Sequence, residues 1–145
     1  RYCNIANVAG LTVYNKAIAA GQCVTILGGG ADATNTGIQA TVAQHTNPTQ
    51  VALDSSGNIY SASYGNHRTV KVTRSGGSAG VMDILFGRNN ASYYIRIQPD
   101  ESYEGTAGTS NDMTYPTGVA VDPTGEFLYV SNYINNQIKK IKLTP

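Results

Sequence analysis

Hydrophobic and polar residues alternate over short distances along this chain, or short apolar runs are broken by turn residues within about six positions, which is the pattern of short β-strands. The most helix-like stretch, residues 36–44, is long enough for only about two turns. We interpret it as a loop that contains about one helical turn. The pattern therefore predicts an all-β chain.

A stretch of this pattern occurs twice in the sequence. Residues 48–72 read PTQVALDSSGNIYSASYGNHRTVKV, and residues 116–141 read PTGVAVDPTGEFLYVSNYINNQIKKI, with one additional residue near Phe127. Both copies begin with Pro-Thr, continue through Val-Ala to an Asp, and reach a Gly three positions later. A repeat on this scale indicates that one supersecondary unit is used twice.

Each copy predicts a first strand that starts at a proline, Pro48 or Pro116, where the strand needs no ladder donor. The apolar runs at residues 51–53 and 119–121 are continuous, which is typical of a strand buried on both faces. We therefore expect both runs to be covered by other parts of the folded domain.

A turn follows the first strand in each copy. It starts at Asp54 or Asp122, and Gly57 or Gly125 supplies the positive φ that such a turn requires. The two aspartates could also be read as a carboxylate pair for acid–base catalysis, but their identical places in the two copies favour turn capping. The remaining strands are expected at residues 59–62 and 69–72, and at residues 127–130 and 138–141.

The shared pattern, Pro-x-x-Val-Ala-x-Asp-x-x-Gly-x-x-Tyr followed by an Asn-rich turn and an alternating basic strand, resembles the NHL repeat. That resemblance implies a β-propeller built of four-stranded blades. Residues 81–87 resemble the outermost strand of the first blade, and residues 23–28 resemble the same strand of a preceding blade. Residues 28–32 resemble the linker that leads into a new blade.

The resemblance divides the chain into four parts. A blade takes roughly 40–50 residues, and a closed ring typically needs about four to eight blades. The 145 residues therefore give about two to three four-stranded blades, an incomplete propeller. The parts are an N-terminal segment with a partial blade and a Gly-rich linker (1–47), a blade (48–87), a long inter-blade insertion (88–115) and a blade that lacks its fourth strand (116–145).

An incomplete propeller leaves strand edges uncovered, which natural proteins avoid. Three arrangements would cover them: the chain is a piece of a longer propeller, several copies assemble into a ring or filament, or the blades form an open stack. We expect residues 23–27 to donate a strand to the last blade, within one ring or between neighbouring molecules.

The sequence starts at Arg1, and we expect a processed or truncated product or, equally, a boundary chosen for expression.

Composition and charge exclude several functions. Charged residues make up 13%, and ten basic residues stand against nine acidic ones for a formal net charge of +1. This balance disfavours a nucleic-acid binder that neutralises phosphates. The sequence has no apolar run of about 18 residues, so we expect no membrane-spanning helix. The hydrophobic content of 41% excludes disorder as the main state.

Two cysteines, Cys3 and Cys23, lie near the start of the chain. We expect them to form one disulfide in an oxidising compartment, and the alternative is a pair of buried free thiols in a cytosolic protein. Asn90, in the sequence Asn-Ala-Ser, is an acceptor motif for N-glycosylation. Low charge, abundant tyrosine and this motif together favour a secreted, extracellular glycoprotein.

Tyrosines gather in or beside the long insertion: Tyr93, Tyr94, Tyr103 and Tyr115. Tyrosine is favoured at protein interfaces because it buries a large area at a low entropic cost. We expect these residues to contact a protein partner, and plain packing of the loop is the alternative.

No catalytic or metal-binding constellation is recognised in the sequence. The histidines are His45 and His67, too few for the zinc site that a resemblance to propeller lyases would imply. Carboxylates in the Gly-rich loops could hold calcium, but their spacing fits no EF-hand. We therefore expect no cofactor, no bound metal and no enzymatic activity.

Two classes of function are consistent with these observations. The first is a secreted structural or interaction module that binds protein partners, copies of itself or the rest of a longer propeller chain. The second is a fragment of a propeller enzyme, a metal-dependent lyase or hydrolase, whose channel site is incomplete in this chain. We favour the first, since no residues with a catalytic arrangement are found.

Overall fold

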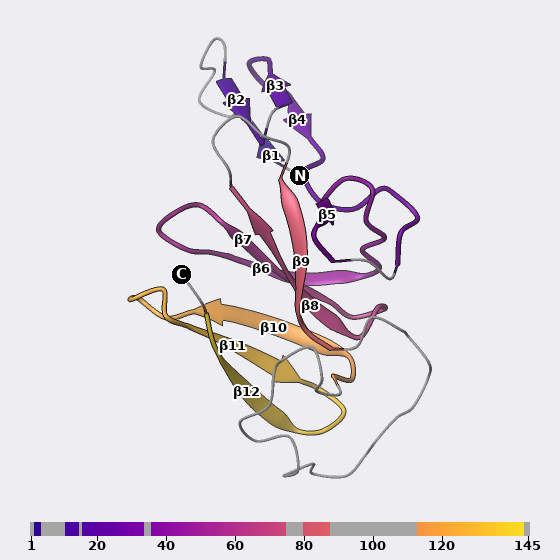
Figure 1. Ribbon diagram of the computed structural model, residues 1–145, viewed down its shortest axis with the longest axis vertical. Coiled ribbons are helices and arrows are strands. Elements are labelled where there is room, and N and C mark those ends of the chain that lie inside the picture. Colours follow the sequence, from indigo (N-terminus) through magenta and orange to yellow (C-terminus); the bar gives the residue numbers. More distant parts are fainter. Residues whose placement is uncertain are drawn as a thin grey trace.

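The fold consists of β-strands joined by turns and loops (Figure 1). The computed structural model describes residues 2–3, 11–14, 16–33, 36–74, 80–87 and 113–143. Within these ranges every regular element is a strand, and the strands form four antiparallel sheets, so the all-β prediction is confirmed. The same ranges form no closed ring or barrel, and none of them contains a helix with the length and apolar character needed to cross a membrane.

The first repeat forms the central sheet. Strands β6 (Pro48–Leu53), β7 (Ile59–Ser63), β8 (Arg68–Thr73) and β9 (Val81–Phe86) pair in sequence order as an antiparallel meander. The outermost strand that was expected at residues 81–87 is therefore present as β9. A short strand from earlier in the chain, β5 (Ile38–Gln39), adds to the outer edge of β9 and makes the sheet five-stranded.

The second repeat forms a sheet of three strands. They are β10 (Pro116–Val121), β11 (Phe127–Asn132) and β12 (Gln137–Lys142), again paired in sequence order. Among the described residues no strand pairs with the outer edge of β12. The sheet of the second repeat therefore has one strand fewer than the meander of the first.

The two repeats share backbone geometry as well as sequence. The pairing register shifts at the same place in both, after Pro48 in β6 and after Pro116 in β10. The turn glycines Gly57 and Gly125 have φ of 79° and 77°. The residues before the two prolines, Asn47 and Tyr115, both have positive φ, 49° and 51°. Equivalent residues thus perform equivalent structural functions in the two units.

The N-terminal segment forms two small sheets. Strand β1 (Tyr2–Cys3) pairs with β4 (Cys23–Val24), and β2 (Leu11–Val13) pairs with β3 (Lys16–Ile18). Cys3 and Cys23 lie opposite each other in the first pair and are joined by a disulfide, as expected. The strand expected at residues 23–28 has only two residues, and its described pairing is with β1. It does not donate to the second repeat within this chain.

The stretch at residues 36–44 contains strand β5 and a turn at residues 40–42, and no helix. The expected helical turn is therefore wrong. The reason is that this stretch pairs with β9: the N–H of Gly37 donates to Met82 O over 2.9 Å, and that of Ala40 donates to Gly80 O over 2.8 Å. Bonds to a neighbouring strand replace the local bonds that a helix would need.

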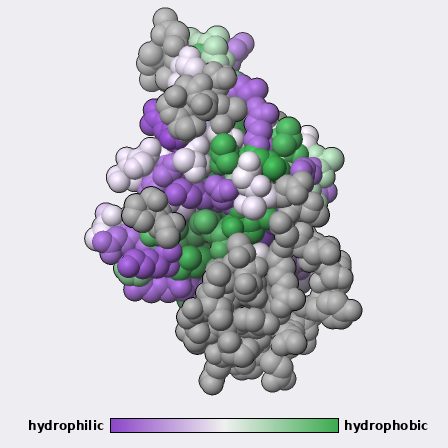
Figure 2. Space-filling model, viewed as in Figure 1, coloured by the Kyte–Doolittle hydropathy of each residue, from purple (hydrophilic) through white to green (hydrophobic). Residues whose placement is uncertain are grey.

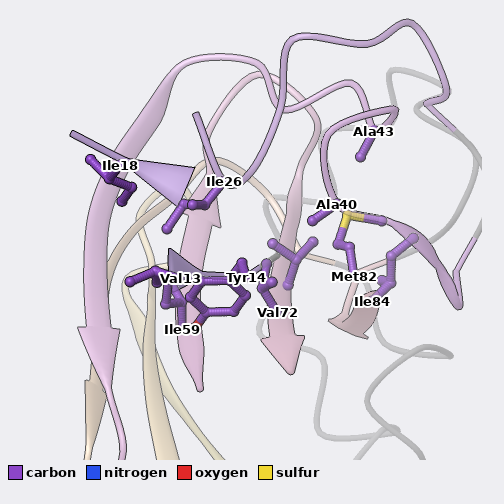
Figure 3. Close-up of a cluster of buried hydrophobic side chains, with 11 residues drawn as sticks. Val13, Tyr14, Ile18, Ile26, Ala40, Ala43, Ile59, Val72, Met82 and Ile84 are labelled. Atoms are coloured by element: carbon purple, nitrogen blue, oxygen red, sulfur yellow. The ribbon is translucent and has the colours of Figure 1, made fainter. Parts of the chain in front are cut away.

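Two hydrophobic clusters lie on opposite faces of the central sheet. The first cluster joins the N-terminal segment to β7, β8 and β9 (Figure 3). The second joins the central sheet to the sheet of the second repeat. Buried members of the first cluster include Val13, Tyr14, Ile18, Ile26, Ala40, Ile59, Val70, Val72, Met82 and Ile84. Buried members of the second are Tyr60, Ala62, Phe86, Met113, Val119, Leu128, Val130 and Leu143.

The expectation that both first strands are buried on both faces is wrong for both strands, since Ala120 in β10 is exposed and β6 is exposed at two of its three apolar residues. Val51 and Leu53 are 57% and 58% exposed, whereas Val119, the counterpart of Val51, is 3% exposed. The first repeat covers one face of β10, but the N-terminal segment covers β7, β8 and β9 without covering β6. Strand β6 is therefore left open on the face that carries Val51 and Leu53.

Candidate interaction surfaces

The contact between the two repeats defines how these units pack. One face of the central sheet, with Tyr60 and Ala62, packs against Val119, Leu128 and Val130 of the second repeat. The most extensive contact between strands of the two repeats is between β6 and β10. Hydrophobic side chains, green in Figure 2, gather across the middle of the molecule in this view. The repeat is thus a unit with two different apolar faces.

Two polar contacts fix the register of β10 on β6. Thr49 Oγ1 donates to the carbonyl of Pro116 over 3.2 Å, and the N–H of Val119 donates to Gln50 Oε1 over 3.2 Å. A Cβ on Gly118 would lie 3.0 Å from Gln50 Oε1 and 2.8 Å from Ser131 Oγ. The absence of a side chain at Gly118 therefore lets Gln50 reach across to the second repeat.

The second repeat has an open face on its far side. Ala120 and Lys140 lie opposite Tyr129 on the two neighbouring strands. Ile138 lies opposite Ser131, two positions after Tyr129 on the same strand, so Ala120, Tyr129, Ile138 and Lys140 share one face. Tyr129 is 37% exposed and Ile138 is 69% exposed. We call this surface the outer face of the second repeat: Ala120, Tyr129, Ile138 and Lys140.

The equivalent face of the first repeat is covered. There Ala52, Tyr60 and Lys71 form the same row, and Tyr60 is 1% exposed because the second repeat packs on it. The ammonium of Lys71 lies 5.9 Å from the Tyr60 ring centre, and that of Lys140 lies 5.7 Å from the Tyr129 ring centre. The equivalent Lys–Tyr pairs thus differ in their tyrosine, which is buried in the first repeat and exposed in the second.

The open side of β6 is the second exposed apolar surface. Val51 and Leu53 lie opposite Ser61 and Ile59, so they share the face on which the N-terminal segment packs. We call this surface the open β6 face: Val51 and Leu53. Sequence reasoning missed both surfaces. Comparing the repeats position by position could have found one signal of the outer face, because Ile138 stands where the first repeat has Thr69.

Tyr115 is the one expected contact tyrosine that lies in the described residues. Its ring packs against Tyr64, with ring centres 4.4 Å apart, and against His67, also 4.4 Å apart. Its N–H donates to His67 Nδ1 over 3.3 Å. Tyr115 therefore packs within the chain, and its role toward a partner stays a prediction. The other expected site residues, Asn90, Tyr93, Tyr94 and Tyr103, lie outside the described residues.

His45 belongs to a buried polar group between the N-terminal segment and the central sheet. Its Nε2 lies 2.9 Å from Ser61 Oγ, while its Nδ1 is buried without a hydrogen-bond partner. Burial, and then the nearby charge of Arg68, lower the pKa of His45 to about 4. The guanidinium of Arg68, which is 1% exposed, donates to the carbonyls of Ala33 and Gln44 over 2.7 and 2.5 Å. This group holds the segment to the sheet.

Asp54 and Asp122 cap the two equivalent turns, as predicted. Asp54 accepts from the N–H groups of Ser56 and Asn58, from Asn58 Nδ2 and from Tyr60 Oη. Burial raises the pKa of Asp54, but these hydrogen bonds outweigh it and hold that pKa below its usual value. Hydrogen bonds, first from the Thr124 side chain, also lower the pKa of Asp122.

Within the described ranges, no three side chains of His, Cys, Asp or Glu come together as a cation site. Models of known protein families and curated proteins give no match to this sequence.

Proposed function

We propose that this chain is a secreted interaction module of the NHL-like propeller type, which binds protein partners or copies of itself in a ring or filament. The observation that carries the proposal is the pair of apolar surfaces left open at the two ends of the repeat array. Val51 and Leu53 are open at one end, and Tyr129 and Ile138 are open at the other. Contiguous apolar surface of this kind is typical of protein interaction sites.

Two further properties support an extracellular role in assembly. The Cys3–Cys23 bond is of a kind that persists in oxidising compartments. The formal net charge of +1 gives little long-range repulsion between copies, and a net charge close to zero promotes association. A secreted module that binds its own kind is consistent with both.

Sedimentation velocity tests the proposal directly. The purified chain, with its disulfide intact, is measured over a hundredfold range of concentration. We expect the weight-average mass to rise above the 15.3 kDa of one chain as concentration increases, because apolar burial drives association by mass action. A single 15.3 kDa species at every concentration would contradict self-assembly.

A further inference from the structure

We propose that copies of this chain dock head to tail, with the open β6 face of one copy covering the outer face of the second repeat of the next. The docked pair would repeat the packing that already joins the two repeats within one chain. This inference rests on the proposed function and deepens it by assigning the two surfaces and their order. The partner is therefore a second copy of the chain.

The open β6 face corresponds to a surface that is buried in the second repeat. Val51 and Leu53 hold the positions that Val119 and Val121 hold in the second repeat. In the second repeat these residues belong to the cluster that packs on the first repeat, and Val119 is 3% exposed. In the first repeat nothing in the described chain packs at the corresponding place, and Val51 is 57% exposed. The open β6 face is thus one half of an interface that the chain already makes.

The outer face of the second repeat corresponds to the other half of that interface. The outer face of the second repeat is equivalent to the face of the first repeat that carries Tyr60 and Ala52. That face is buried by the second repeat, and Tyr60 is 1% exposed. Its counterpart Tyr129 is 37% exposed, and the equivalent lysine, Lys140, lies above its ring. In the docked pair, the open β6 face of the neighbouring copy would cover Tyr129 as the second repeat covers Tyr60 within the chain.

A polar contact can be reproduced between copies as well. Within the chain, the side chain of Thr49 donates to the carbonyl of Pro116. The corresponding groups at the open ends are the hydroxyl of Thr117 and the carbonyl of Pro48. Gly118 stands in place of Gln50, so the second inter-repeat hydrogen bond has no counterpart. Ile138 stands in place of Thr69 and adds apolar area to the contact instead.

The N-terminal segment limits where a neighbouring copy can dock on the central sheet. The segment packs over β7, β8 and β9 on the side of the open β6 face. A neighbour can therefore reach that side at β6, and β6 is the strand of the first repeat that has the most extensive contact with β10 inside the chain. Because the two surfaces differ, the contact is heterologous, and each copy binds one neighbour at each end.

Two blocked variants test this order. Val51→Asp with Leu53→Asp blocks the open β6 face, and Ala120→Asp with Ile138→Asp blocks the outer face of the second repeat. All four positions are exposed, so we expect both variants to fold. We expect each variant alone to sediment as a 15.3 kDa monomer, because a charge at either surface prevents apolar contact. Mixed in equal amounts, the two are expected to form dimers that do not grow further, since only one functional pair of surfaces remains.

The controls separate this inference from the proposed function. Val42→Asp changes an exposed apolar residue away from both surfaces, 44% exposed, and is expected to assemble as the unchanged chain does. If an aspartate pair prevents folding, threonine at the same positions gives the same test, because threonine is favoured in strands. Failure of the unchanged chain to associate would contradict the self-assembly part of the proposed function, and head-to-tail docking with it. Association that survives either pair, or a mixture that stays monomeric, would overturn head-to-tail docking alone.

Discussion

Asn66 and Asn132 accept hydrogen bonds from equivalent backbone amides although they stand at different positions in the two repeats. The N–H of Thr46 donates to Asn66 Oδ1 over 2.6 Å, and the N–H of Thr114 donates to Asn132 Oδ1 over 2.9 Å. In the first repeat, Ser63 occupies the place of Asn132 and donates to Asn66 over 2.8 Å. The same amide is thus satisfied by two different arrangements.

This relationship predicts an unequal effect of two substitutions at Asn132. Asn132→Ala leaves the buried N–H of Thr114 without a partner, and we expect a loss of about 1–3 kcal/mol in the free energy of unfolding. Asn132→Ser restores the side-chain arrangement of the first repeat, since Asn135, the counterpart of Asn66, has a buried Oδ1 without a partner. We expect it to be about 1 kcal/mol more stable than Asn132→Ala. Urea denaturation measures both, and equal losses would contradict the prediction.

The disulfide is expected to stabilise the N-terminal segment and, through it, the central sheet. The bond closes a loop with a sequence separation of 20, which is worth about 3 kcal/mol in the chain-entropy view. Cys3→Ser with Cys23→Ser should lower the unfolding free energy by an amount of this order. Non-reducing peptide mapping of the unchanged chain provides the control and should return one linked pair. Two alkylatable thiols would rule the bond out.

Acid is expected to destabilise the fold through His45. Its pKa is about 4 in the folded chain and 6.5 as the reference value, so the unfolded chain takes up the proton first as pH falls. Stability is therefore full above about pH 6.5 and decreases toward pH 4, by about 3 kcal/mol over the whole window. Thermal unfolding at pH 7, 6 and 5 should show this decline.

His45→Gln keeps a polar group for Ser61 and removes the titration. We expect a flatter pH dependence in this variant over the same range. The part that remains is expected to come from His67, since burial also lowers the pKa of that residue. An unchanged slope in His45→Gln would show that His45 is not the titrating group.

The two capping aspartates are expected to differ in their contribution to stability. Asp54→Ala removes the acceptor for Tyr60 Oη and for two backbone amides, and we expect a loss of about 1–2 kcal/mol. Asp122→Ala is the matched control at the exposed counterpart and should cost less. Since the pKa of Asp54 is lowered, its contribution is present above its usual pKa and is lost as pH falls through the folded value. Chemical denaturation at pH 7 and pH 3 tests both statements.

Local turn chemistry made much of the fold predictable from the sequence. Pro48 and Pro116 start strands, and Gly57 and Gly125 have the positive φ that was expected. These features depend on residues that lie close together in the chain. The alignment of the two repeats therefore gave strand positions that agree with the structure to within a few residues.

Features that depend on distant parts of the chain could not be predicted in the same way. Val51 and Val119 have the same residue type and the same place in the repeat, yet 57% and 3% of their surfaces are exposed. The difference depends on what packs opposite each strand, which a local pattern does not contain. The buried group around His45 and Arg68 was missed for the same reason, because its partners come from a segment without a repeat motif.

Strand β5 has a consequence for the order in which the chain folds during synthesis. It emerges from the ribosome before the central sheet, yet its partner is β9, with Ile38 opposite Met82. Val13 and Ile18 likewise pack in a cluster with Val72 and Met82. The N-terminal segment therefore lacks the β9 part of its docking surface until Phe86 has been translated, and non-local pairing of this kind is slow. The Cys3–Cys23 loop needs only its own residues, so it can close before the central sheet has been made.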